Sequence, residues 1–254
     1  MKALANALAV LDAFSTNRGR WSVKDLCDQT GFNKSQVSKV LGAFREAGLL
    51  RQDDETREYS VGLRAVALAA NYLNAEPLVH ESIAHMRRLA YEVDHTVVLS
   101  VLDGDKVMYL LGVEGPHFLD VGSRVGTWLP FHATAVGKVL IAFASADPAF
   151  RIPAGELKRF TRNTLTDRKA LAAQFARIRR EGMASTTGET ADGLAAQAVP
   201  VVGRGGAVIA ALGFVYPLHL VTPKKREAYT GLLHGAARQI SMRMGAEVYP
   251  FGKR

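Results

Sequence analysis

Apolar residues recur every three or four positions in three short segments of the first 48 residues, and this spacing predicts three helices. The first segment ends where Arg18, Gly19 and Arg20 interrupt the pattern. The residues expected to face inward are Leu4, Leu8, Val10, Leu11 and Phe14 in the first helix, Val23, Leu26 and Cys27 in the second, and Val37, Val40, Leu41 and Phe44 in the third.

Capping residues delimit the second and third predicted helices. Ser22 begins the second, and Asp25 follows three positions later, which is the spacing of a capping box. Gly31 ends that helix at a position that requires a left-handed backbone. Asn33 begins the third helix, with Gln36 at the reciprocal position. Two short helices around a tight glycine turn are typical of a helix-turn-helix.

The third predicted helix keeps a polar edge that suits a DNA major groove. Glutamine can read adenine through two hydrogen bonds, lysine can reach guanine or a phosphate, and serine fits either. No acidic residue occurs from residue 29 to residue 45. A solvated face on an ordinary helix is the plainer explanation, but the caps, the glycine turn and the absence of acids together favour DNA binding. The expected contacts are Lys34, Ser35, Gln36, Ser38 and Lys39.

A β-hairpin is predicted immediately after the third helix. Residues 49–52 and 57–61 read as two strands around the polar turn at residues 53–56. A hairpin in this place is the wing of a winged helix-turn-helix, so we expect that domain at residues 1–61. Arg51 and Arg57 are expected to meet the DNA backbone or the minor groove, although the acids at the tip argue against deep insertion.

Residues 62–76 form the predicted linker to a larger domain at residues 77–254. The linker reads as a short apolar helix that Pro77 stops, and its many small residues also suit packing against a second copy.

The larger domain alternates predicted helices with strands that are paired by hairpins. Asp103-Gly104 marks the first of these hairpins. This arrangement predicts an α+β fold, with an antiparallel sheet flanked by helices. Helices are expected at 78–93, 134–144, 166–180 and from Thr222 onward, and strands at 95–102, 106–113, 118–121, 195–202 and 208–216.

Composition narrows the classes of protein. No apolar run reaches the roughly 18 residues of a transmembrane helix, and the first helix leaves no room for a signal peptide, so a cytoplasmic location without membrane contact is expected. Cys27 is the single cysteine, which excludes an internal disulfide. The net charge of +8 divides into +2 for residues 1–75 and +6 for the remainder. The local charge around the third helix is therefore more informative than the total.

One loop of the larger domain has the composition of a ligand site. Residues 125–138 lead through glycine and proline into a helix start with small side chains. The first turn of a helix offers unpaired N–H groups and a partial positive charge, so a carboxylate can dock there. Trp128 and Phe131 are expected to wall the apolar part of the ligand, and His132 to bond or pair with it. A purely structural loop explains the same residues equally well.

Enzyme chemistry finds little support in the sequence. The segment is not a phosphate loop, because His132 stands where a glycine is needed and no Ser or Thr follows Lys138. The histidines lack metal-ligand spacing, and the larger domain contains no cysteine nucleophile and no G-x-S-x-G elbow. We expect no metal, no cofactor and no catalytic residue; the alternative is an enzyme with an incidental helix-turn-helix.

Three ordered motifs resemble the IclR family of bacterial transcriptional regulators. They are TGFNKSQVSKVLGAFREAGLL followed by REYSVGLRAVALA, GTWLPFHATAVGKVLIAF, and REGMASTTGETADGLAAQAVPVV followed by GGAVIAALGF. The second is similar to that family's signature G-x-R-x-P-L-H-x-T-A-x-G-K. The resemblance implies a GAF-like effector-binding domain and small organic acids or aromatic metabolites as effectors. It also implies a homodimer or homotetramer that binds palindromic double-stranded operators, often beside a catabolic operon.

The resemblance also implies particular effector contacts, on the loop, the helix start and two late strand positions. Trp128 stands where the signature often has arginine, and Phe131 where leucine is common. Thr186 and Ala196 stand where some members hold a polar acid with aspartate and cysteine. We therefore expect an aromatic or larger apolar carboxylate as the effector. The implied contacts are Trp128, Leu129, His132, Thr134, Ala135, Val136, Thr186 and Ala196.

Overall fold

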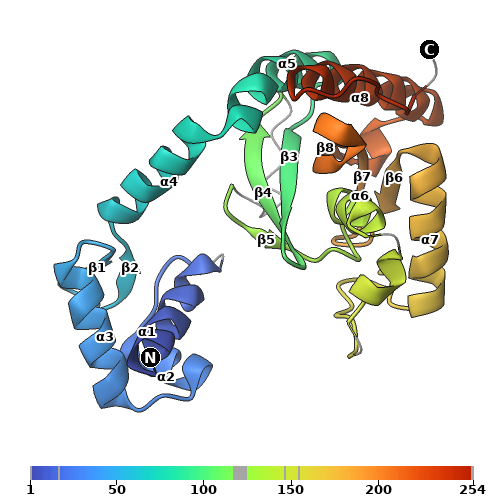
Figure 1. Cartoon of the computed structure of the whole chain (residues 1–254). Helices are drawn as coiled ribbons and strands as arrows, with labels where there is room; N and C mark the ends of the chain where they lie inside the picture. The colour runs from blue at the N-terminus through green and yellow to red at the C-terminus, as the bar shows by residue number, and fades with distance from the viewer. Residues whose placement is uncertain (1, 17, 117–124, 146, 154, 253–254) are drawn as a thin grey trace. The chain divides into compact units, whose positions relative to one another are not determined.

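The computed structural model describes residues 2–16, 18–116, 125–145, 147–153 and 155–252. The chain divides into two compact units, Met1–Glu76 and Pro77–Arg254 (Figure 1). The short strand predicted at residues 118–121 lies outside the described residues.

The first unit begins with the helices that the apolar spacing predicts. Ser22 and Asp25 form the capping box of α2, and Gly31 ends that helix with a left-handed backbone at φ 72°. The Asn33 side chain caps the next helix by accepting a hydrogen bond from the Gln36 backbone N–H at 2.9 Å. These caps confirm the sequence prediction. The helices are α1 (Lys2–Asp12), the 3₁₀ turn η1 (Ala13–Ser15), α2 (Val23–Thr30) and α3 (Lys34–Glu46).

A two-stranded wing follows α3. The strands β1 (Leu50–Gln52) and β2 (Tyr59–Val61) pair antiparallel, which confirms the predicted hairpin. Trp21 forms an isolated antiparallel bridge with Tyr59 of β2, because the two backbones exchange hydrogen bonds at 2.9 and 2.8 Å. The backbone then passes from Gly62 into α4 (Leu63–Ala75).

The junction between the wing and α4 is very close-packed. A Cβ atom added to Gly62 would come within 2.4 Å of the Gly48 carbonyl oxygen, so only glycine fits at residue 62. The Gly62 N–H also donates to the Leu49 carbonyl at 2.8 Å. The start of α4 is therefore held directly against the chain that leaves α3.

The core of the first unit confirms most of the inward-facing residues, with two corrections in α1. Leu4 and Leu8 were expected inside but are 64% and 51% exposed, because only the C-terminal end of α1 reaches the core. α4 has no fully buried residue within the described chain, and its apolar Leu63 and Val66 are 86% and 60% exposed. The buried core residues are Val10, Ala13, Trp21, Leu26, Val37, Leu41, Leu50 and Tyr59.

The second unit is built on a six-stranded sheet in the order β5-β4-β3-β8-β7-β6. Every neighbouring pair is antiparallel, in agreement with the predicted α+β fold. β5 and β6 were not predicted as strands because both are very short. The strands are β3 (Val97–Asp103), β4 (Lys106–Val113), β5 (Trp128–Leu129), β6 (Ala184–Thr187), β7 (Leu194–Val202) and β8 (Val208–Pro217).

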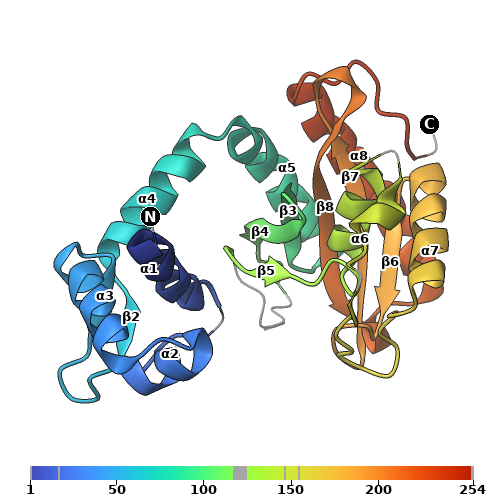
Figure 2. The same ribbon diagram turned by 60° about the horizontal axis from the view of Figure 1, so that its bottom comes forward.

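Helices cover both faces of this sheet. α5 (Pro77–Val93) and α8 (Pro223–Arg243) pack together on one face (Figure 1). α6 (Ala135–Phe143) and α7 (Arg168–Glu181) pack together on the other (Figure 2). The remaining short elements are the 3₁₀ turns η2 (Pro148–Arg151), η3 (Arg204–Gly206) and η4 (Leu218–Leu220).

The helix starts of this unit lie at or near the positions that the sequence predicts. Thr222 caps α8 with Pro223 in its first turn, as the start expected at Thr222 predicts, and Thr134 caps α6. α7 begins two residues after the predicted start at residue 166, because Asp167 is its cap and accepts a hydrogen bond from Ala170 N at 2.7 Å. The Thr166 hydroxyl instead accepts from Arg159 at 2.9 Å.

Candidate DNA-binding and effector-binding sites

The polar edge of α3 is fully presented to solvent. Val37 and Leu41 on the opposite side are 0% exposed, which fixes the rotation of the helix. The Asn33 cap consumes the backbone N–H of Gln36 and leaves its side chain exposed. Because residues 29–45 contain no acid, this edge carries only positive and neutral groups. The exposed side chains are those of Lys34, Ser35, Gln36, Ser38 and Lys39.

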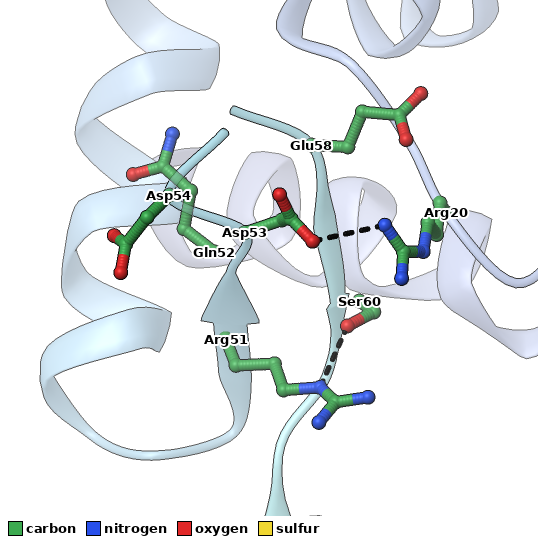
Figure 3. Close-up of a pocket in the computed structure, with 7 residues that line it drawn as sticks. All are labelled: Arg20, Arg51, Gln52, Asp53, Asp54, Glu58 and Ser60. Carbon is green, nitrogen blue, oxygen red and sulfur yellow. Dashed lines mark hydrogen bonds and ion pairs between the residues drawn. The ribbon is translucent and has the colours of Figure 1, made fainter. Parts of the chain in front are cut away.

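The wing presents a hollow of about 270 Å³ on its outer face. Figure 3 shows Arg51 directed toward Ser60 and Arg20 toward Asp53. Arg51 Nε donates to Ser60 Oγ at 3.0 Å, and Arg20 forms an ion pair with Asp53 at 3.0 Å. Three acids and two arginines line the hollow, so the wing face carries mixed charge. The lining residues are Arg20, Arg51, Gln52, Asp53, Asp54, Glu58 and Ser60.

Asp53 organises the tip of the wing. Its carboxylate accepts the backbone N–H groups of Glu55 and Thr56 at 3.1 and 2.9 Å. The Thr56 N–H is the main cause that lowers the pKa of Asp53, with the Arg20 charge as a smaller one. Arg57 follows in a left-handed backbone at φ 58°, and its side chain is exposed. Arg57 therefore extends into solvent from a rigid turn.

Arg20 was not among the residues expected from the sequence. It precedes Trp21, whose backbone pairs with β2 and whose ring is buried, so alternation puts Arg20 on the outer face of the wing. The alternation of charged and buried residues at 20 and 21 is the signal in the sequence. It becomes readable only when the pairing between Trp21 and Tyr59 is known.

Six of the expected effector residues, Leu129 among them, gather on the sheet face beneath α6. Thr186 of β6 pairs in register with Ala196 of β7, so both side chains project to the same face. Ala135 and Val136 belong to the hydrophobic cluster on that face, and Phe131 packs against it. This grouping offers mostly apolar surface with one hydroxyl.

The start of α6 is shaped by Thr134 and Gly137. The Thr134 hydroxyl donates to the Pro130 carbonyl at 2.9 Å and accepts from Gly137 N at 3.3 Å. A Cβ atom at Gly137 would lie 2.6 Å from the Phe131 Cα, so the loop backbone approaches the helix closely. The first intrahelical bond runs from Lys138 N to Thr134 O at 3.0 Å. The N–H groups of residues 135 and 136 precede it, so they have no partner within the helix.

His132 is buried and makes its contacts within the protein. It is 4% exposed, and its Nε2 lies 2.9 Å from the Lys158 carbonyl oxygen. Its ring also lies 6.0 Å from that of Phe160, measured between centroids. At least one of its two ring nitrogens therefore holds the chain rather than facing a ligand.

Trp128 lies apart from the other expected effector residues. β5 pairs Leu129 with Val107 and Trp128 with Met108. Val107 and Leu129 belong to the cluster under α6, so the Trp128 side chain projects to the opposite face. There the Lys106 ammonium lies 5.5 Å from its ring centroid.

Comparison with known proteins gives matches in both units. The family model described as the IclR helix-turn-helix domain matches residues 3–54, and the one for the IclR C-terminal domain of bacterial transcriptional regulators matches residues 70–242. This chain belongs to the IclR family of transcriptional regulators.

Individual IclR-family relatives align along nearly the full chain. The HTH-type transcriptional regulator KdgR of Escherichia coli K12 is 31% identical over 99% of this chain and 95% of its own. A crystal structure from Silicibacter sp. TM1040, described as an IclR transcriptional regulator, has a TM-score of 0.85 at 28% identity over 99% of this chain and 100% of that one. An IclR homologue from Microbacterium hydrocarbonoxydans, crystallised with 4-hydroxybenzoate, has a TM-score of 0.80 at 25% identity over 96% and 100%.

Within the described ranges, no three His, Cys, Asp or Glu side chains are grouped so that they could hold a metal ion. Among the helices of the same residues, none combines the length and apolarity needed to cross a membrane.

Proposed function

We propose that this IclR-family regulator binds a palindromic operator through the polar edge of α3 and the wing, and that a small organic acid in the second unit controls its operator affinity. The exposed, acid-free edge of α3 above a fully buried opposite face carries the proposal. The effector would favour one quaternary arrangement and so change the spacing of two recognition helices. The proposed DNA contacts are Lys34, Ser35, Gln36, Ser38, Lys39, Arg51 and Arg57.

Sequence reading and backbone contact can be separated by two substitutions in α3. Gln36→Ala should remove roughly 1–3 kcal/mol of discrimination between operator and random DNA. Lys39→Ala should weaken binding to both DNAs alike and lower the salt slope of binding by about 1. Fluorescence anisotropy with the upstream region of the regulator's own gene, at several salt concentrations, measures both effects.

The control for this experiment is Lys169→Ala, an exposed lysine on α7 in the other unit. It should leave affinity and salt slope unchanged. Equal losses on operator and random DNA in Gln36→Ala would remove Gln36 as a reader of sequence. The absence of any sequence-specific complex with wild-type protein would count against the proposed function itself.

The proposed effector is an aromatic or larger apolar carboxylate. Its carboxylate would dock on the N–H groups at the start of α6, and its apolar part against Phe131, Val136 and Ala196. The 4-hydroxybenzoate bound in the Microbacterium hydrocarbonoxydans homologue supports an aromatic acid, and the uncharged pair Thr186 and Ala196 fits it. Leu129, Thr134 and Ala135 complete the proposed contacts; His132 and Trp128 stay predictions from the sequence.

Calorimetry with a panel of aromatic acids tests this assignment. Phe131→Ala should weaken the best acid roughly tenfold or more, which corresponds to about 1.4 kcal/mol of lost apolar contact. Trp128→Ala should have a smaller effect, since its side chain projects from the other face. Unchanged affinity in Phe131→Ala, with DNA binding intact, would reject the assigned contacts.

Self-association is also part of the proposal. Apolar side chains on α1 and α4 are exposed within the first unit, among them Leu8 at 51%, Leu63 at 86% and Leu68 at 59%. Exposed apolar side chains mark an interaction surface where they form a contiguous patch. A homodimer, or a tetramer built from dimers, would cover them and present two recognition helices to a palindrome.

A further inference from the structure

Lys138 carries a charged side chain into the core of the second unit. It is 0% exposed on α6, and its Nζ donates to Glu189 Oε1 at 2.6 Å. Glu189 follows β6 and is 8% exposed. Burial lowers the pKa of Lys138, while the hydrogen bond and charge of Glu189 act in the opposite direction. A buried ion pair is weak evidence for stability, because desolvation offsets the attraction. The role of the Lys138–Glu189 pair here is to hold nearby segments of the chain in place.

Glu189 fixes one end of the segment formed by residues 158–165, which we call the strap. Its second carboxylate oxygen accepts the Leu165 N–H at 3.3 Å. Its backbone carbonyl accepts the Thr164 hydroxyl at 2.7 Å. The Thr161 hydroxyl donates to the carbonyl of Gly188, the preceding residue. This end of the strap is therefore tied to the chain that leaves β6, and through the ion pair to α6.

The other end of the strap is tied to the loop before α6. The Lys158 carbonyl lies 2.9 Å from His132 Nε2, and the Phe160 ring lies against His132. The strap thus joins the segment before α6 to the segment after β6. Thr134 and Thr186, two of the proposed effector contacts, lie within two or three residues of these anchor points.

We propose that the Lys138–Glu189 pair is a latch that holds the strap across the effector site, so that an acid enters or leaves only when the strap loosens. The proposal rests on the proposed function for the location of that site. Lys138 and Glu189 are positioning residues in it and do not contact the acid.

Hydrogen exchange in the full-length protein without ligand tests the latch directly. The double variant Lys138→Met with Glu189→Leu removes both charges together and so leaves no unpaired buried charge. Amide exchange in the strap should accelerate at least about tenfold, while exchange in β7 and α8 stays unchanged. The control is Arg88→Ala with Glu92→Ala, which removes an exposed ion pair of α5 and should leave the strap unaffected.

Glu189→Gln tests the latch if the double variant fails to fold. It keeps an oxygen that can accept from Leu165 N but abolishes the ion pair, so strap exchange should still rise several-fold. Strap exchange equal to wild type in a folded double variant, or in Glu189→Gln when the double variant is unfolded, overturns the latch.

A second arm links the latch to the effector, with 4-hydroxybenzoate as the probe. In stopped-flow measurements its dissociation should be at least about tenfold faster from the folded latch variant than from wild type. Equal dissociation rates together with a loosened strap would show that the strap does not close the site, and would overturn that part. Failure of wild type to bind any acid of the panel would contradict the proposed effector class, while the exchange experiment still decides the latch.

Discussion

His234 shows how one buried side chain sets a pH response. Its Nδ1 lies 2.9 Å from the Tyr249 hydroxyl, which itself donates to the Pro200 carbonyl at 3.2 Å. Burial, with the Arg238 charge as a second cause, lowers the pKa of His234 to about 4. The folded protein therefore keeps this ring neutral at a pH where an unfolded chain protonates it.

A loss of stability in mild acid follows from this shift. Above pH ~6.5, the ordinary pKa of histidine, the ring is neutral in both states. Between about 6.5 and 4 only the unfolded chain binds the proton, so the free energy of unfolding falls as pH falls. Urea unfolding at pH 7 and pH 5 measures the change. His234→Asn should reduce it, while His219→Asn, at an exposed position, should not. Identical pH dependence in wild type and His234→Asn would contradict this account.

At the scale of elements, the start of α3 depends on one side chain. Asn33→Ala should destabilise the first unit by about 1 kcal/mol, because the Gln36 N–H loses its cap. Asn33→Asp should keep the cap and the stability, but its negative charge beside the polar edge should weaken DNA binding. Thermal unfolding and anisotropy measure the two effects separately. Equal DNA affinity in Asn33→Asp and wild type would place the DNA away from the start of α3.

Elements with local signals are predictable from the sequence, and elements that depend on distant partners are not. The caps at Ser22, Asn33 and Thr222 involve residues within three positions, so their spacing is visible. β5 and β6 exist through pairing with β4 and β7, and two or four residues carry too little pattern of their own.

The same distinction applies to the two sites. The edge of α3 follows from helical spacing on one short segment, and the structure presents it as exposed. The opposite direction of Trp128 depends on the register between β4 and β5, which no motif records. Lys138 and Glu189 meet across 51 positions, so their pairing had no local signal. The sequence marks Lys138 only as part of the family signature.

For the whole molecule, the exposed apolar residues of α4 bear on assembly. Val66 and Leu68 are 60% and 59% exposed within the first unit and lie on different sides of the helix. If copies of the chain pack there, Val66→Glu or Leu68→Glu should shift the protein toward monomer in light scattering, and operator affinity should fall because one half-site is lost. Lys169→Glu, at an exposed site on α7, is the control. Unchanged mass in both α4 variants would move the interface elsewhere.

The contact between Gly48 and Gly62 has a mechanical consequence. Since Gly62 abuts the carbonyl of Gly48 just after α3, the start of α4 and the end of α3 meet at one close backbone contact. A rotation of α4 should therefore be transmitted through this contact to α3, whose exposed edge carries the proposed DNA contacts. A larger residue at position 62 should force this contact apart, so that the protein keeps the proposed operator contacts but loses the proposed response to an effector.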